Sequence, residues 1–319
     1  MIKTRLTEKL AITHPIISAP MAFAATGQLA SAVTEAGGLG MIGGGYGDPQ
    51  WISEQFAQTG NRRIGCGLIT WRADLNPEVL DSTLALKPAA LFLSFGNPKP
   101  HAKKIKDQGI PLICQVQTLK DAQNALDCGA DIIVAQGSEA GGHGEKRATL
   151  TLVPEVADLI AKQYPDALLC AAGGIADGRG LAAALMLGAD GVLMGSRLWA
   201  SREANVSQSM HQAALNATGD ETLRTQVMDV VRHLPWPERY TARVLKNDFT
   251  NRWHHDLDGL RNASATEAPQ WEQAWAAGDA EKSNTFVGEA SGLISAIESV
   301  DTIIDRTVSQ AKSLLNRQW

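Results

Sequence analysis

The sequence has few cysteines, no long apolar run and no excess of positive charge. Its four cysteines form no C-x-x-C pair; they are Cys66, Cys114, Cys128 and Cys170. Three of them fall in predicted strands, where a reduced cysteine serves as a small apolar side chain. No apolar run is long enough to cross a bilayer, and the N-terminus lacks the apolar core of a signal peptide. We therefore expect a cytoplasmic protein with reduced cysteines and no membrane partner.

The charge balance is slightly acidic, with 34 Asp and Glu against 29 Lys and Arg and a net charge of −5. Nucleic-acid binding depends on basic patches, so we expect no nucleic-acid partner. A hydrophobic content of 44% is ordinary for a globular protein with a large core. The length of 319 residues suits one barrel of typical size with an appendage.

Short apolar runs alternate with segments of helical periodicity over about the first 200 residues. The predicted strands are 16–19, 39–42, 64–69, 90–94, 112–116, 132–136, 168–172 and 191–195. The predicted helices are 27–36, 49–58, 78–86, 102–108, 119–127, 154–164 and 178–187. Eight strand–helix units predict an α/β fold of the (β/α)8 TIM barrel type. An open doubly wound sheet is the alternative, but no clear reversal of strand order supports it.

Residues 38–43 spell G-x-G-x-x-G, the fingerprint of a dinucleotide-binding turn. That motif works only where it leaves a strand and opens a helix. Here it begins at the end of a predicted helix and runs through the next predicted strand. We therefore do not expect a Rossmann fold.

The character of the chain changes after Leu198. We expect residues 1–200 to form a cofactor-binding barrel and residues 201–319 a helical extension near its mouth, without a convincing strand. Helical periodicity covers 207–218 and 289–315, whereas 262–270 is predicted to be a loop. His254 and His255 are adjacent and face apart, so we expect no metal site there.

Two predicted strands, one helix apart, end in small residues. Gly173 and Gly174 follow the first, and Gly195 and Ser196 follow the second. Bare backbone N–H groups at such ends can surround an anion, and barrels often bind phosphate after their last two strands. The alternative is that these glycines only make tight turns. We favour a phosphate site.

Residues 136–144 read QGSEAGGHG and place His143 among glycines at the end of another predicted strand. Barrel enzymes position catalytic groups at this rim, and a histidine can take a proton from carbon near neutral pH. A solvated loop histidine is the alternative. The neighbouring phosphate site favours a functional role for His143.

Other rim positions are weaker candidates. Residues 18–22 (SAPMA) form a proline-stiffened strand end. This segment suits the edge of an aromatic ring system; the alternative is that it only ends the strand. Gly67 and Gln115 are candidates by position, and Gln115 and Gln136 carry amides that can both donate and accept. Trp71 follows the third predicted strand, and we expect it either to line a substrate pocket or to pack at the surface.

The combination of these motifs resembles the nitronate monooxygenase family, formerly called 2-nitropropane dioxygenases. The matching segments are 19–21 (APM), 136–144, 172–180 (AGGIADGRG) and 194–197 (MGSR). The resemblance covers the barrel and, more loosely, the extension through Arg243 to Asn247. Enoyl-acyl carrier protein reductases and NADH:quinone reductases of the same group carry similar motifs.

The resemblance implies FMN at the carboxyl ends of the strands. Residues matching the phosphate site are Gly173, Gly174, Gly195 and Ser196. Residues along the isoalloxazine are Ala19, Pro20, Met21 and Ala22. Further flavin contacts are Gly67, Gln115, Gln136, Gly137, Gly141 and Gly142. His143 matches the catalytic histidine, and relatives often have lysine or histidine where this chain has Gln115.

The implied activity is oxidation of an alkyl nitronate or nitroalkane by FMN and O2 to a carbonyl compound and nitrite. One alternative is an NAD(P)H-dependent flavin reductase acting on a quinone or enoyl thioester, and another is a flavin-binding protein without turnover. Some members line the substrate pocket with tyrosines of the extension. This chain has only Tyr46, Tyr164 and Tyr240, so that pocket is not transferred. A homodimer is left open.

Overall fold

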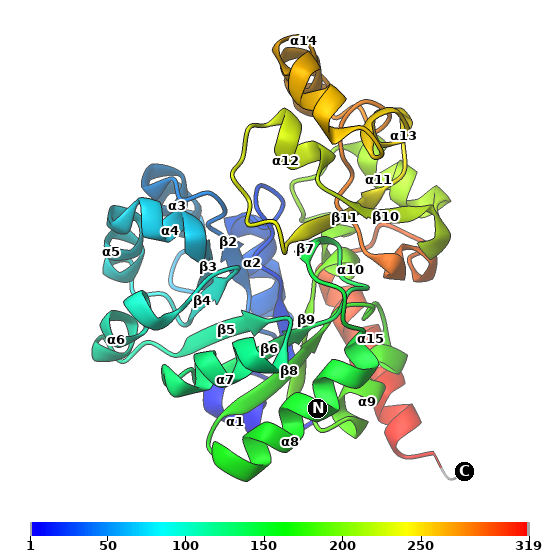
Figure 1. Ribbon diagram of the computed structural model, residues 1–319. Helices are drawn as coiled ribbons and strands as arrows, with labels where there is room; N and C mark the ends of the chain where they lie inside the picture. The colour runs from blue at the N-terminus through cyan, green and yellow to red at the C-terminus, as the bar shows by residue number, and fades with distance from the viewer. Residues whose placement is uncertain (1, 318–319) are drawn as a thin grey trace.

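The computed structural model describes residues 2–317 and contains a barrel of eight parallel strands surrounded by helices (Figure 1). The strands are β1 (Ile16–Ser18), β2 (Met41–Gly43), β3 (Gly65–Ile69), β4 (Leu91–Ser94), β5 (Leu112–Val116), β6 (Ile132–Gln136), β8 (Leu168–Ala172) and β9 (Gly191–Met194). Their order is β1-β9-β8-β6-β5-β4-β3-β2. Ile17 bridges to Leu39 just before β2, which closes the ring. The predicted TIM barrel is confirmed.

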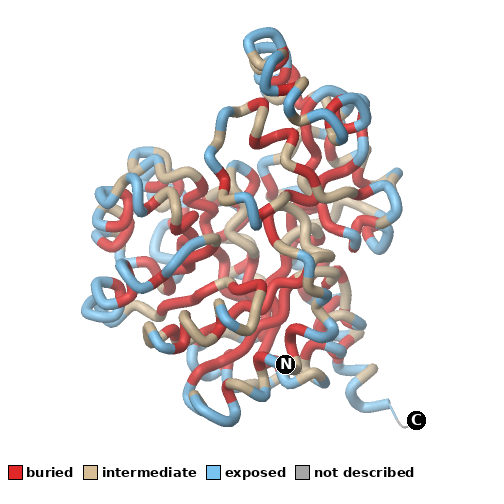
Figure 2. Tube along the Cα trace, in the orientation of Figure 1, coloured by how far each residue is buried: buried red, intermediate tan, exposed pale blue. Residues whose placement is uncertain are grey.

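The strands are buried on both faces, which explains their continuous apolar sequences. Alternate side chains enter two different cores: Phe92 points into the barrel interior, whereas Leu91 and Leu93 pack against the outer helices. In Figure 2 the strands are buried and the outer sides of the helices are exposed. Cys66, Cys114 and Cys170 lie in strands as predicted, and all four cysteines are free thiols.

Seven helices around the barrel follow the predicted alternation, and one more, α4 (Thr70–Leu75), directly after β3, was not predicted. The seven are α2 (Gly27–Glu35), α3 (Pro49–Ala57), α5 (Pro77–Ala85), α6 (Lys99–Asp107), α7 (Leu119–Asp127), α8 (Thr149–Gln163) and α9 (Gly178–Met186). The start of α9 is capped by Asp177, whose side chain accepts from the Arg179 N–H at 2.9 Å. The G-x-G-x-x-G segment runs into β2 rather than opening a helix, so it is not a dinucleotide turn.

A first helix, α1 (Arg5–Leu10), was not predicted. Its Leu6 and Leu10 belong to the interior cluster of the barrel, so the helix covers one end of that core. Within residues 2–317, no helix is both long enough and apolar enough to cross a membrane.

The part of the chain after Leu198 is not purely helical. It begins within α10 (Ser196–Trp199), and its further helices are α11 (Gln208–Asn216), α12 (Val227–Val231), α13 (Asp248–Trp253), α14 (Leu257–Ala277) and α15 (Val300–Leu315), with 3₁₀ helices at Gly219–Glu221 and Glu289–Leu293. Two strands, β10 (Thr222–Thr225) and β11 (Thr241–Leu245), contradict the expectation of no strand. They form an antiparallel sheet, β10-β11-β7, with β7 (Gly142–Gly144) from the barrel.

The loop predicted over 262–270 is also wrong, because this tract lies inside α14, with Pro269 within the helix. One face of α14 is buried through Leu260, Glu267, Trp271 and Ala274, at helical spacing. The other face is exposed in Figure 2, which is why the sequence there is polar. Only one narrow face of α14 is apolar, so its helical periodicity was too weak to outweigh the turn-forming residues in this tract.

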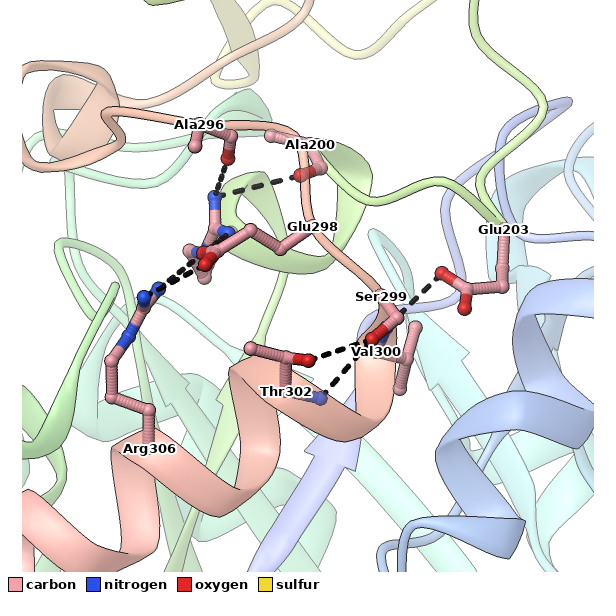
Figure 3. Close-up of polar contacts among 9 residues, drawn as sticks. Ala200, Glu203, Ala296, Glu298, Ser299, Val300, Thr302 and Arg306 are labelled. Carbon is pink, nitrogen blue, oxygen red and sulfur yellow. Dashed lines mark hydrogen bonds and ion pairs between the residues drawn. The ribbon is translucent and has the colours of Figure 1, made fainter.

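The helix α15 packs against α9 and α2 and so completes the outer ring of the barrel. Ser299 caps its N-terminus, because the Ser299 hydroxyl accepts from the Thr302 N–H (Figure 3). The helix predicted over 289–315 is therefore interrupted before Val300. Just ahead of it, Glu298 pairs with Arg306 and, at 2.9 Å, with Arg197 of α10.

We predict that Glu298→Gln destabilises the fold by about 1–2 kcal/mol at pH 7, because buried Arg197 loses its carboxylate partner. Hydrogen bonds from Arg306, and then the charges of both arginines, lower the pKa of Glu298 below its ordinary 4.5. This stabilisation is present above pH 4.5 and is lost as pH falls through the folded-state pKa. Urea unfolding should therefore show a difference between wild type and variant at pH 7 that shrinks in acid. A difference independent of pH would contradict the assignment.

Candidate active site

A cavity of about 670 Å³ lies at the carboxyl ends of the barrel strands, beneath the extension. Residues at or just after the end of all eight barrel strands line it; they are Ala19, Gly45, Ile69, Phe95, Gln115, Gln136, Gly173 and Gly195. The extension contributes Arg232, Trp236, Trp275 and others to the lining. The volume falls in the range of small-molecule and cofactor sites.

All but one of the predicted site residues line this cavity. Those that do are Ala19, Pro20, Met21, Ala22, Gly67, Gln115, Gln136, Gly141, Gly142, His143, Gly173, Gly174, Gly195 and Ser196. Gly137 is not among them. A Cβ at Gly137 would lie 2.0 Å from Oγ1 of Thr149, so this glycine lets the end of β6 approach the start of α8.

One side of the cavity is a rim of small residues after β8 and β9. Gly173 and Gly174 have φ values of +103° and +74°, a conformation that L side chains rarely adopt. Ser196 is fixed because its hydroxyl accepts from the Gly288 N–H at 2.8 Å. A Cβ on Gly195 would have only the Ala19 Cβ, at 3.6 Å, among its neighbours. The rim therefore offers backbone groups without bulky side chains.

A second wall is formed by the segment after β1. A Cβ on Gly67 would lie 2.3 Å from the Pro20 Cβ, so only a glycine allows Pro20 to pack against the middle of β3. Ala19 donates its N–H to the Met194 carbonyl at 2.9 Å, which ties this segment to β9. The wall is rigid and apolar, as a flat ring requires.

Glutamine amides connect three segments of the rim. The Gln136 side-chain oxygen accepts from Gln117 at 2.8 Å and from Gln115 at 3.2 Å. Its amide nitrogen donates to the His143 carbonyl at 3.1 Å. The network holds the backbone of β7 beside β6. Gln117 was not predicted, because it lies beyond the end of β5.

His143 is the titratable group at the centre of the site. Its Nε2 lies 3.0 Å from both carboxylate oxygens of Asp229, on α12, and both residues are buried. Its ring stacks on Trp236 with ring centroids 3.4 Å apart and an interplanar angle of 6°. Asp229 is not part of the cavity lining, so it lies behind the imidazole.

Burial lowers the pKa of His143 below its ordinary value of 6.5. Asp229 raises this pKa through its charge and hydrogen bond, whereas the charges of Arg232 and Arg224 lower it, and the net direction is downward. The imidazole is therefore neutral at pH 7 and able to accept a proton.

Arg232 is the one permanently charged side chain among the described residues lining the cavity. Its guanidinium lies over the Tyr46 ring, 4.9 Å from the centroid, and over Trp271 at 5.6 Å. Within residues 2–317 it forms no ion pair with a carboxylate. A cation without a counterion in a partly enclosed cavity favours an anionic ligand.

The sequence predictions for the aromatic residues had different outcomes. Trp71 does not line the cavity but packs edge-to-face against Trp236, with centroids 5.3 Å apart, so the packed alternative holds. Tyr46 does line the cavity, from the loop after β2 rather than from the extension. Tyr240 lies behind Phe95 and Trp236.

Sequence reasoning missed Asp229, Arg232 and Trp236 as site residues. Asp229 carried a usable signal, since it is a single carboxylate inside the apolar run VMDVV of residues 227–231. A charged residue is rarely buried unless it is paired, so a carboxylate in an apolar run indicates a partner elsewhere in the chain. Arg232 and Trp236 carried no signal that distinguishes them from surface residues.

We predict that Trp236→Ala raises the pKa of His143 toward 6.5, because removal of the indole hydrates the imidazole. NMR titration of the ring protons of His143 measures this directly. Trp236→Phe retains a ring over the imidazole and should produce a smaller rise. An unchanged or lower value in the alanine variant would contradict burial as the main cause.

Comparison with known proteins agrees with the motifs. The model of the nitronate monooxygenase family matches residues 3–61 and 76–310. A nitronate monooxygenase from Neurospora crassa is 31% identical over 345 residues, covering 95% of this chain and 90% of the relative. A (3aS,4S,5R,7aS)-5-hydroxy-7a-methyl-1-oxo-octahydro-1H-indene-4-carboxyl-CoA dehydrogenase from Rhodococcus jostii is also 31% identical, covering 84% of this chain and 74% of the relative.

Among solved structures, FabK from Thermotoga maritima superposes with a TM-score of 0.87 at 31% identity, covering 99% of this chain and 98% of that chain. The resemblance found in the motifs is confirmed over nearly the whole chain. The chain belongs to the nitronate monooxygenase family and is an oxidoreductase of the flavin-dependent type.

Proposed function

We propose that the protein binds FMN and oxidises alkyl nitronates with O2, giving a carbonyl compound and nitrite. The observation that carries this proposal is that one cavity holds both the His143 imidazole, which burial shifts toward its neutral form, and Arg232, a cation that forms no ion pair among the described residues. An imidazole base suits a neutral nitroalkane, and a cation suits the nitronate anion formed from it. Family membership supports the same reaction.

The residues of the cavity fit FMN. The phosphate would lie at the small-residue rim of Gly173, Gly174, Gly195 and Ser196, where backbone groups can approach an anion. The isoalloxazine would lie along Ala19, Pro20, Met21 and Ala22. Further contacts would come from Gly67, Gln115, Gln136, Gly141 and Gly142, while Gly137 would act only through packing. Gln115 brings no positive charge to the flavin.

Bound FMN would supply the redox chemistry, and the protein positions substrate and moves a proton. His143 would take the proton from the carbon beside the nitro group, because its imidazole is neutral. Arg232 would attract the resulting anion. Trp236 would limit access of water to the imidazole it covers. In this proposal residues 1–200 carry the flavin, and the extension from 201 completes the site.

We predict that His143→Asn abolishes turnover of neutral nitroalkanes and leaves flavin content unchanged, because asparagine cannot act as a base near pH 7. Nitrite release from nitroethane, with flavin absorbance measured on the same sample, provides the test. Unchanged nitrite release would remove His143 from the mechanism.

We predict that Gly195→Asp weakens FMN binding about tenfold or more, since a carboxylate at the rim repels the phosphate. Gly195→Asn is the matched control, because asparagine has the shape of aspartate without its charge. Riboflavin, which lacks the phosphate, should bind Gly195→Asp and Gly195→Asn with similar affinity. Equal losses of FMN and riboflavin affinity in the Asp variant would argue against a phosphate at this rim.

The second candidate is a flavin reductase that uses NAD(P)H on a quinone or enoyl thioester. The 31% identity to a dehydrogenase supports it. Stopped-flow mixing of the oxidised protein with NADH distinguishes the two: rapid bleaching of the flavin supports the reductase, and persistent absorbance supports the monooxygenase. Nitrite release from a panel of nitronates would exclude a flavin-binding protein without turnover.

A further inference from the structure

We propose that Asp229 is a positioning residue that holds the proton of His143 on Nε2, so that Nδ1 is the atom that accepts the substrate proton. This inference rests on the proposed function and assigns its base to one atom. It extends the site to a carboxylate outside the cavity lining.

The hydrogen-bond geometry determines the tautomer. An ionised carboxylate can only accept hydrogen bonds, so the neutral imidazole must donate from Nε2 to Asp229. Both carboxylate oxygens lie 3.0 Å from Nε2, which centres the donor between them. Within residues 2–317, no protein group hydrogen-bonds to Nδ1. The lone pair on Nδ1 is therefore available for a proton.

The surroundings keep this pair rigid. Asp229 is 3% exposed and lies among the apolar side chains of α12. Its carbonyl accepts from the Leu234 N–H at 2.9 Å, and the Leu234 carbonyl accepts from the Trp236 N–H at 2.8 Å. One connected turn therefore carries both groups that contact the imidazole: the Asp229 carboxylate at its edge and the Trp236 indole on its face.

The three charges facing His143 come from two elements and the residues beside them. Asp229 lies on α12, Arg232 directly follows α12, and Arg224 lies on β10. The two arginines disfavour a protonated imidazole, and Asp229 opposes them. Removing the Asp229 charge would therefore lower the basicity of His143, and the proton of the neutral imidazole would no longer be held on Nε2.

The proton transfer balances on the substrate and the imidazole. The C–H bond next to the nitro group breaks, its electron pair forms the C=N bond of the nitronate, and the negative charge moves to the nitro oxygens. The proton forms a new bond to Nδ1, and Asp229 stabilises the resulting imidazolium. A preformed nitronate has already lost this proton. Only the neutral nitroalkane therefore requires the pair as a base.

The test compares nitroethane with its preformed nitronate on the FMN-loaded Asp229→Asn variant. We expect kcat/KM to fall about 100-fold or more for nitroethane, the range of general-base catalysis, and little for the nitronate. Glu267→Gln is the matched control: Glu267 is also buried in the extension, but its carboxylate bonds to Trp253 and Arg252. This control should affect both substrates equally, if at all.

Equal losses for both substrates in Asp229→Asn would overturn the inference and leave the proposed function standing. A flavin-loaded wild type that turns over neither substrate would instead overturn the proposed function.

The tautomer can be measured without activity. In ¹⁵N-histidine-labelled holoprotein at pH 7, the His143 signals, identified by their loss in His143→Asn, should show a protonated Nε2 and an unprotonated Nδ1. In Asp229→Asn we expect a mixture of tautomers or a reversed assignment. A wild-type His143 protonated on Nδ1 would overturn the inference whether or not the variant folds.

Discussion

The antiparallel pairing of β7 with β11 is the contact on which the site depends. It places His143 opposite Ala242 and Gly142 opposite Arg243, so a loop that follows a barrel strand becomes part of a sheet of the extension. His143 thereby gains a fixed backbone at the mouth of the barrel. The same pairing brings α12, and with it Asp229, against the imidazole. Without it, His143 would have neither its position nor its carboxylate partner.

The two parts of the molecule contribute different properties to the cavity. The barrel supplies small residues and amides, with glycines where any side chain would collide with Pro20 or force the backbone out of its conformation. The extension supplies charge and aromatic rings, through Asp229, Arg232 and Trp236. Burial of the imidazole favours its neutral form beside Arg232, which forms no ion pair among the described residues. This combination favours a reaction that begins with a neutral acid and ends with its anion.

Much of the barrel could be predicted from the sequence, because a strand buried on both faces has a continuous apolar sequence and ends at a glycine-bearing turn. The rim residues could therefore be located at the strand ends from the sequence alone. The extension could not be predicted in this way. Strand β11 reads TARVL: Ala242 and Val244 face one core and Leu245 another, and its partner β7 lies about a hundred residues earlier in the chain. Asp229 is 86 residues from His143, so no local pattern could join them.

We propose that the rim after β8 and β9 binds the phosphate of a flavin whose ring lies beside His143. A crystal structure of the protein reconstituted with FMN would decide this. We expect density for the phosphate at Gly173, Gly174, Gly195 and Ser196 and for the ring between Pro20 and the His143 imidazole. Density for the phosphate elsewhere, or a protein that takes up no FMN, would contradict it.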